Sequence, residues 1–144
     1  MGTPLIVTGS GSILSSGGND AVVAGVVSPS LSNSGLLQAS GTGIGLHVTA
    51  GGSLNFVTNG GTVAQAGGGS QAALRIEAGG TIGVLNNLNT GSIGNATGVA
   101  LNVFGQLGTL TNSGTIGSVS SLAGAGIILE SNATASSIVN NAGG

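Results

Sequence analysis

Short stretches in which apolar and polar side chains alternate recur along most of the chain. The clearest is an aliphatic residue, one variable residue and a second aliphatic residue, at Leu46–Val48, Leu74–Ile76, Leu101–Val103 and Ile127–Leu129. Their first residues are 28, 27 and 26 positions apart. Alternation with a period of two predicts strands with one buried face. Stacked on one another, these strands would form a core ladder of Leu46, Val48, Leu74, Ile76, Leu101, Val103, Ile127 and Leu129.

A second motif, Asn-x-Gly-x-aliphatic, alternates with the first. Its asparagines are Asn33, Asn59, Asn89 and Asn112, at spacings of 26, 30 and 23, and a weaker copy ends near Asn140. Asparagine favours turns and can hydrogen-bond to its equivalents in a stack, and glycine fits a corner with positive φ. We therefore expect structural corners at Asn33, Gly35, Asn59, Gly61, Asn89, Gly91, Asn112 and Gly114.

A third apolar stretch lies between these two motifs, at residues 51–56, 79–84 and, more loosely, 105–109. Each unit of about 27 residues therefore holds three short strands separated by Gly, Ser, Asn or Thr. Scattered glycines and β-branched apolar residues disfavour helices. The pattern predicts an all-β fold, a parallel β-solenoid of about five coils with three strands in each.

The repeats indicate a single domain in which residues 29–144 form the regular coils. Residues 1–28 fit the repeat less well, because only Ile13-Leu14 and Val22-Val23 suggest strands there. We expect this segment to be an irregular first coil or an N-terminal extension.

Composition narrows the possible functions. Gly, Ser, Thr and Asn account for 31, 19, 13 and 13 of the 144 residues, and charged residues for 3%. The apolar content of 40% argues against disorder. A single basic residue, Arg75, argues against binding to nucleic acid or to anionic membranes. No apolar run is long enough to span a membrane, so we expect no membrane insertion by this segment, and no basic N-terminal region marks a signal peptide.

Residues capable of chemistry are few. Glu77 and Glu130 follow equivalent strands two coils apart, and a separation of about 9.6 Å would be near the upper end for an inverting glycosidase. Solvated side chains are the better interpretation, with Arg75 and Glu77 as an exposed pair. His47 has no second ligand at metal-binding spacing, and Asp20 is the only aspartate for a catalytic triad. We expect no catalytic residue, no metal and no cofactor.

The repeats LTNSGTI at 110–116, GIIL at 126–129 and GVALNV at 98–103 resemble those in passenger regions of bacterial autotransporters, the type V secretion proteins. The resemblance extends over roughly residues 29–144. It implies an exported, right-handed parallel β-helix displayed on a Gram-negative outer membrane, often as an adhesin or a stalk. By this resemblance we expect that the signal and membrane anchor of a whole autotransporter are not present in this chain.

We therefore expect a structural or adhesive segment of an extracellular bacterial surface protein, a β-helical passenger stalk or adhesin fragment without catalysis. Its partners would be host surface glycans or matrix. The alternative is a self-assembling β-solenoid subunit of an extracellular fibre, because solenoid ends without caps can stack on further copies of the same chain.

Overall fold

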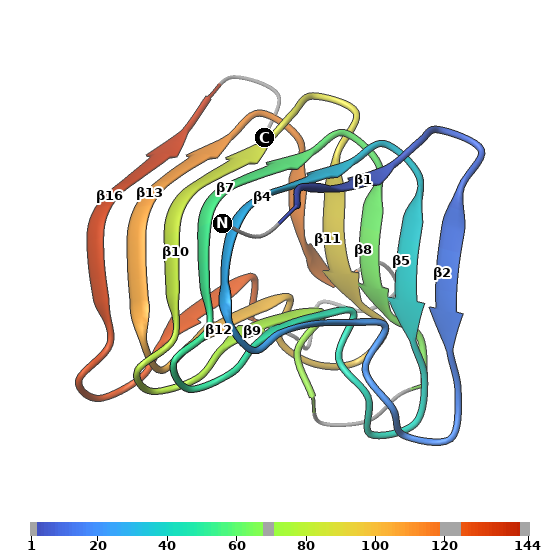
Figure 1. Ribbon diagram of the computed structural model, residues 1–144, viewed down its shortest axis with the longest axis horizontal. Coiled ribbons are helices and arrows are strands. Elements are labelled where there is room, and N and C mark those ends of the chain that lie inside the picture. The colour runs from blue at the N-terminus through green and yellow to red at the C-terminus, as the bar shows by residue number, and fades with distance from the viewer. Residues whose placement is uncertain (1–2, 68–70, 119–124, 142–144) are drawn as a thin grey trace.

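The structure, a computed structural model, describes residues 3–67, 71–118 and 125–141. Within them sixteen strands form three parallel sheets and no helix is present, which confirms the predicted all-β solenoid (Figure 1). Sheet A contains β1 (Leu5–Val7), β4 (Val27–Asn33), β7 (Ser53–Asn59), β10 (Thr81–Asn87), β13 (Gln106–Asn112) and β16 (Thr134–Asn140). Sheet B contains β2 (Ser12–Ser15), β5 (Leu36–Ala39), β8 (Thr62–Gln65), β11 (Ser92–Asn95) and β14 (Thr115–Ser118). Sheet C contains β3 (Val22–Ala24), β6 (Leu46–Val48), β9 (Leu74–Ile76), β12 (Leu101–Val103) and β15 (Ile127–Leu129).

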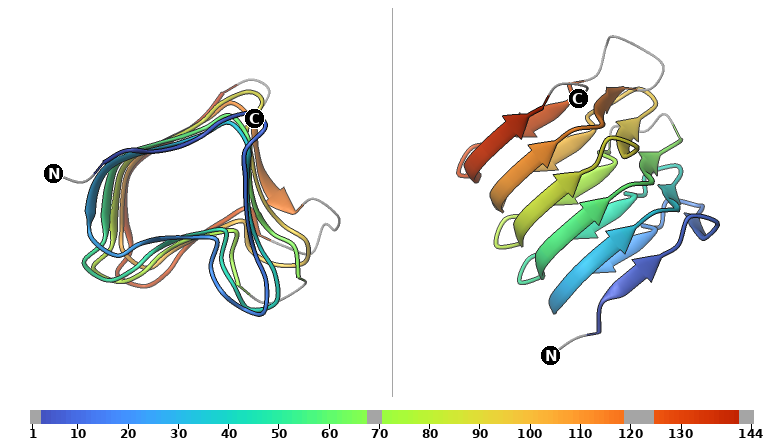
Figure 2. Two further views of the ribbon diagram at one scale, coloured as in Figure 1. Left: turned by 45° about the vertical axis from the view of Figure 1, so that its right-hand side comes forward. Right: turned by 90° about the horizontal axis from the view of Figure 1, so that it is seen from above.

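Each coil passes through sheets A, B and C in that order. In the left view of Figure 2 the chain runs clockwise as it recedes from the blue end, so the solenoid is right-handed. Five complete coils are followed by β16, which begins a sixth turn in sheet A. We call the β1 end of this column its lower end and the β16 end its upper end.

The core is a set of aliphatic ladders inside the column. Leu46 pairs with Leu74, Leu74 with Leu101, and Leu101 with Ile127 in successive strands of sheet C. Val48, Ile76 and Val103 form a second buried ladder in the same strands. The middle residues of β6, β9 and β12 point outward and are half-buried, so burial alternates along these strands as the sequence pattern predicts.

At the upper end of the column the ladder residues are less buried than expected. Ile127 is only partly buried and Leu129 is 44% exposed, although both continue the ladders of sheet C. The expectation of a buried Leu129 is wrong because β15 is the last strand of sheet C in the described residues, and no further coil covers its upper side.

The first coil is in register with the rest. Strands β1, β2 and β3 pair in parallel with β4, β5 and β6. The expected boundary between residues 28 and 29 falls inside β4, which begins at Val27. Strand β1 is short and pairs only with residues 31–33, so residues 27–30 of β4, including Pro29, have no described strand beneath them.

None of the described segments is a helix long and apolar enough to cross a membrane.

Candidate functional site

Most ionisable side chains of the chain meet in one place on the outer face of sheet C. Asp20 precedes β3, His47 is the middle residue of β6, Arg75 is the middle residue of β9, and Glu77 follows β9. His47 and Arg75 are paired in register between adjacent coils. The coiling therefore brings together residues that are up to 57 positions apart. We call Asp20, His47, Arg75 and Glu77 the charged cluster.

His47 lies between two carboxylates. Its Nδ1 atom is 2.6 Å from Oδ2 of Asp20, and its Nε2 atom is 3.2 Å from Oε1 of Glu77. An ionised carboxylate only accepts hydrogen bonds, so a hydrogen on each ring nitrogen satisfies both contacts. The second oxygen of Asp20 accepts the backbone amide of Ile44 at 2.8 Å, which ties the first coil to the second.

Arg75 extends the cluster upward. Its Nε atom lies 2.8 Å from Oε1 of Glu77, and its Nη1 atom donates to Oε1 of Gln71 at 2.8 Å. The guanidinium also stacks on Phe104 of the next coil, 4.6 Å from the ring centroid, a distance that gives a cation–π attraction. The interactions thus run from the first coil to the fourth.

The geometry of the charged cluster favours a structural role, in which side chains of neighbouring coils bind one another, over a catalytic or metal-binding role. Both nitrogens of His47 already face carboxylates, and the side chains of the cluster are 17–29% exposed. The spacing of these residues along the sequence gives no sign of the two contacts: the first coil places Asp20 below His47, and the third places Glu77 above it. These carboxylates approach opposite sides of the ring, and the described part of the chain holds no group of three His, Cys, Asp or Glu side chains arranged around one metal ion.

The two glutamates considered as a glycosidase pair have different surroundings. The backbone amides of Glu77, Phe104 and Glu130 donate to the strand one coil below in the same way, so the three residues occupy equivalent positions. Glu77 is engaged by Arg75 and His47, whereas Glu130 lies in the uppermost coil of sheet C.

A second group of functional side chains lies inside the corner between sheets A and B. The Nδ2 atom of each asparagine donates to Oδ1 of the asparagine one coil above, at 2.7–2.8 Å. We call this the asparagine ladder; its members are Asn33, Asn59, Asn87, Asn112 and Asn140. The first four are almost fully buried, and their amides also donate to backbone carbonyls of the corner. The ladder satisfies polar groups that would otherwise be costly to bury.

The member in the fourth coil is Asn87, and not Asn89 as the Asn-x-Gly motif predicts. Asn89 is exposed in the turn between β10 and β11. Asn87 is the last residue of β10 and pairs in register with Asn59 and Asn112. Four residues separate Asn87 from β11, whereas two residues follow Asn33, Asn59 and Asn112 before the next strand. Asn89 lies in this longer turn, two residues before Gly91, and therefore matches the motif. The nearly regular spacing of 26, 28 and 25 among Asn33, Asn59, Asn87 and Asn112 is the signal that could have identified Asn87.

The corner glycines are needed for close packing. Gly35, Gly61, Gly91 and Gly114 are not among the described residues with positive φ, so the expected reason for these glycines is wrong. A Cβ atom on Gly61 would collide with the backbone of Ser34 and Gly35 in the coil below, and the other three would meet the coil below similarly. Positive φ occurs instead at glycines such as Gly51 and Gly79, in the turns before β7 and β10.

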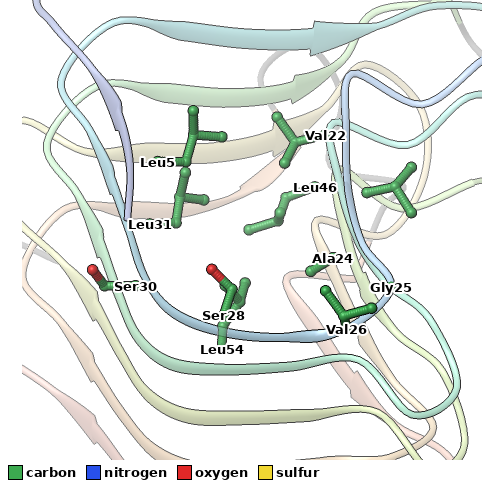
Figure 3. A pocket seen from close by; sticks show the side chains of 11 residues that line it. Leu5, Val22, Ala24, Gly25, Val26, Ser28, Ser30, Leu31, Leu46 and Leu54 are labelled. Atoms are coloured by element: carbon green, nitrogen blue, oxygen red, sulfur yellow. The ribbon is translucent and has the colours of Figure 1, made fainter. Parts of the chain in front are cut away.

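The two ends of the column expose apolar surface. At the lower end a cavity of about 190 Å³ opens between the first coils and is lined mainly by Leu5, Val22, Ala24, Val26, Leu31 and Leu46 (Figure 3). At the upper end a hollow of about 430 Å³ includes Leu110, Ile116, Ile127 and Ile138. Leu129, Ile138 and Val139 are 43–45% exposed there.

These features define a right-handed parallel β-solenoid with an internal asparagine ladder, one charged cluster and two apolar ends. Comparisons with models of protein families, with curated proteins and with solved structures find no match.

Proposed function

We propose that this chain is a structural and adhesive segment of an exported bacterial surface protein, a β-helical passenger stalk or adhesin fragment without catalysis. The observation that carries the proposal is the in-register stack, in which each of the first four coils is joined to the next coil through all three sheets. Such a column holds its outward side chains at a fixed spacing of about 4.8 Å along the axis. Rigid display of a surface is the function that this architecture supports best.

The outward face of sheet A is the best candidate for the adhesive surface. Ser32, Thr58, Asn86 and Thr111 are paired in register and form a row of hydroxyl and amide groups. Phe56 lies two residues before Thr58 and is 57% exposed, an unusual setting for an aromatic ring. An apolar ring beside hydrogen-bonding groups suits the alternating apolar and hydroxyl faces of a glycan.

The test measures binding of the purified chain to immobilised host glycans and extracellular matrix proteins. We expect Phe56→Ala and Thr58→Lys to abolish binding. The matched controls are Leu88→Ala, which removes another exposed apolar side chain, and Ser92→Lys on sheet B, and both should bind as the parent does. Absence of binding by the parent chain, or equal binding by Phe56→Ala and the parent, would contradict an adhesive role for this face.

A second candidate function is a self-assembling subunit of an extracellular fibre. The observation that favours it is the pair of apolar ends, each with unpaired edges of parallel strands. Ile6, Val26 and Val27 are 65–72% exposed at the lower end. Contact between two different ends of identical molecules does not close and generates filaments. Electron microscopy of the purified chain separates the candidates, because filaments support assembly and dispersed single particles support a stalk.

A further inference from the structure

The three sheets do not contain equal numbers of strands. In the described residues sheet A has six strands, and sheets B and C have five each. If two copies stack so that sheets B and C continue without a gap, then β2 and β3 of the upper copy lie on β14 and β15 of the lower copy. Only one place then remains in sheet A, directly beneath β4 of the upper copy. Both β1 of the upper copy and β16 of the lower copy would need that place.

The two competing strands are unequal. Strand β1 covers residues 31–33 of β4 and leaves residues 27–30 without a strand beneath them. Strand β16 pairs with β13 from Gln106 to Asn112, the full length of that strand. Because β4 and β13 hold equivalent positions in their coils, β16 has the length needed to pair with all of β4.

We propose that the chain binds a second copy of itself by strand replacement, with β16 of the lower copy displacing β1 of the upper copy beneath β4. The proposal rests on the second candidate function, self-assembly, and specifies how the junction is built. It is a form of recognition by strand addition, in which backbone hydrogen bonds supply affinity and side chains between the strands supply the register.

The core side chains fit this junction. Ile138 holds the position in β16 that Leu5 holds in β1, so an aliphatic side chain remains beneath Leu31. Ile127 of the lower copy would lie beneath Val22 of the upper copy. The exposed Leu129 would lie beneath Ala24, a small residue at the wall of the lower cavity in Figure 3. The burial of aliphatic side chains from both ends favours association.

The asparagine ladder also becomes continuous. In the single chain the position beneath Asn33 is occupied by Val7 of β1. Asn140 is the corresponding residue of β16. Strand replacement therefore places Asn140 of one copy beneath Asn33 of the next, with the same orientation that each asparagine has toward the one above it. An apolar neighbour of a buried amide is exchanged for a hydrogen-bonding one.

Engineered cysteines test the junction in the full chain, which has no cysteine of its own. Val139 and Ser32 occupy equivalent outward positions, so strand replacement places Val139 of one copy directly below Ser32 of the next, about 4.8 Å away and within reach of a disulfide. The variant carrying Val139→Cys and Ser32→Cys should form a ladder of disulfide-linked multimers on oxidation. Each single variant should stop at dimers.

Two further variants separate strand replacement from simple stacking, in which β1 of the upper copy stays in place and β16 of the lower copy lies beneath it. In simple stacking, Val139 of the lower copy lies below Ile6 of the upper copy, because Ile6 pairs with Ser32 in the single chain. The variant with Val139→Cys and Ile6→Cys reports that arrangement. The variant with Ile6→Cys and Ser32→Cys locks β1 onto β4 when oxidised, and we expect it to lose filament formation and to regain it on reduction.

The outcomes are distinct. Multimers from the Val139 and Ser32 pair, together with loss of filaments in the oxidised lock, support strand replacement. Filaments that cross-link through Val139 and Ile6, or that form despite the oxidised lock, overturn strand replacement and leave self-assembly standing. A parent chain that sediments as a monomer at all concentrations overturns both.

Discussion

The side-chain amide of Asn59 donates to Oδ1 of Asn87, 28 residues later in the chain, across 2.8 Å. Both side chains are almost fully buried, and each belongs to a different coil. One side chain thus fixes the height and the register of the next coil at the corner between sheets A and B. Hydrogen bonds of this kind contribute to stability mainly because the buried partners have no water to replace a lost bond.

Replacing Asn87 by alanine removes an acceptor for Asn59 and a donor for Asn112. Each unsatisfied buried group costs about 1–3 kcal/mol, so we expect Asn87→Ala to lower the free energy of unfolding by at least about 2 kcal/mol. The control is Asn89→Ala, at an exposed position in the turn that follows β10, and this change should alter the free energy of unfolding by less than about 0.5 kcal/mol. Urea titration followed by circular dichroism measures both. Equal effects of the two changes would contradict the placement of Asn87 in the ladder.

The corner glycines provide a second test. A Cβ on Gly61 would overlap the backbone of the coil below, whereas a Cβ on Gly117 in β14 would meet no atom within 4 Å. We expect Gly61→Ala to destabilise the fold by about 2 kcal/mol or more, because backbone atoms have to shift. Gly117→Ala should be neutral or stabilising by up to about 1 kcal/mol, since alanine restricts the unfolded chain. Thermal unfolding of the two variants decides this, and a stable Gly61→Ala would argue against such close coil packing.

The charged cluster predicts coupling between Asp20 and His47. We expect a double-mutant cycle with Asp20→Ala and His47→Ala to give a coupling energy of about 1 kcal/mol, a size typical of partly exposed ion pairs. The same cycle with Glu130→Ala, three coils above His47, should give no coupling. Hydrogen exchange adds a local readout, because Asp20→Ala removes the acceptor of the Ile44 amide, which should then exchange faster. Unchanged exchange at Ile44 would exclude this link between the first two coils.

The aliphatic ladders predict a difference between the middle and the end of the column. Leu74 is fully buried between Leu46 and Leu101, and Leu74→Ala should cost about 2–5 kcal/mol through the cavity it leaves. Leu129→Ala removes the same atoms from a residue that is 44% exposed and should cost far less. Urea titration of both variants gives the comparison. A larger loss at Leu129 than at Leu74 would mean that the upper end is covered in solution.

The repeat made most of the fold predictable. The length of one coil follows from the spacing of Leu46, Leu74, Leu101 and Ile127. The alternation of apolar and polar residues indicates which side chains point inward. The solenoid and its inner ladders could therefore be predicted from the sequence. The exposure of Leu129 did not follow, because burial in a solenoid depends on whether another coil lies above, which no local pattern reports. The motif points to Asn89 because it is defined by the distance to Gly91, whereas membership of the ladder depends on the last residue of the preceding strand, which is Asn87.

The charged cluster was missed for a related reason. Asp20 lies in the first coil, where the repeat is weak, and its approach to His47 depends on the register of β3 with β6. The pairing of Arg75 with Glu77 joins residues only two positions apart and was predicted, although as an exposed pair, whereas the two side chains are 24% and 29% exposed. A contact between two coils can be predicted from the sequence only where the repeat is clear enough in both coils to align their strands.

Nuclear magnetic resonance of the isotopically labelled chain provides the most direct test that equivalent residues of successive coils lie on one another. Nuclear Overhauser contacts should join the side-chain amide protons of Asn59 to the side chain of Asn87, and those of Asn33 to Asn59, while Asn89 should contact neither Asn59 nor Asn112. Contacts from Asn89 to Asn59, or no contact between any two of these amides, would contradict the stacked column.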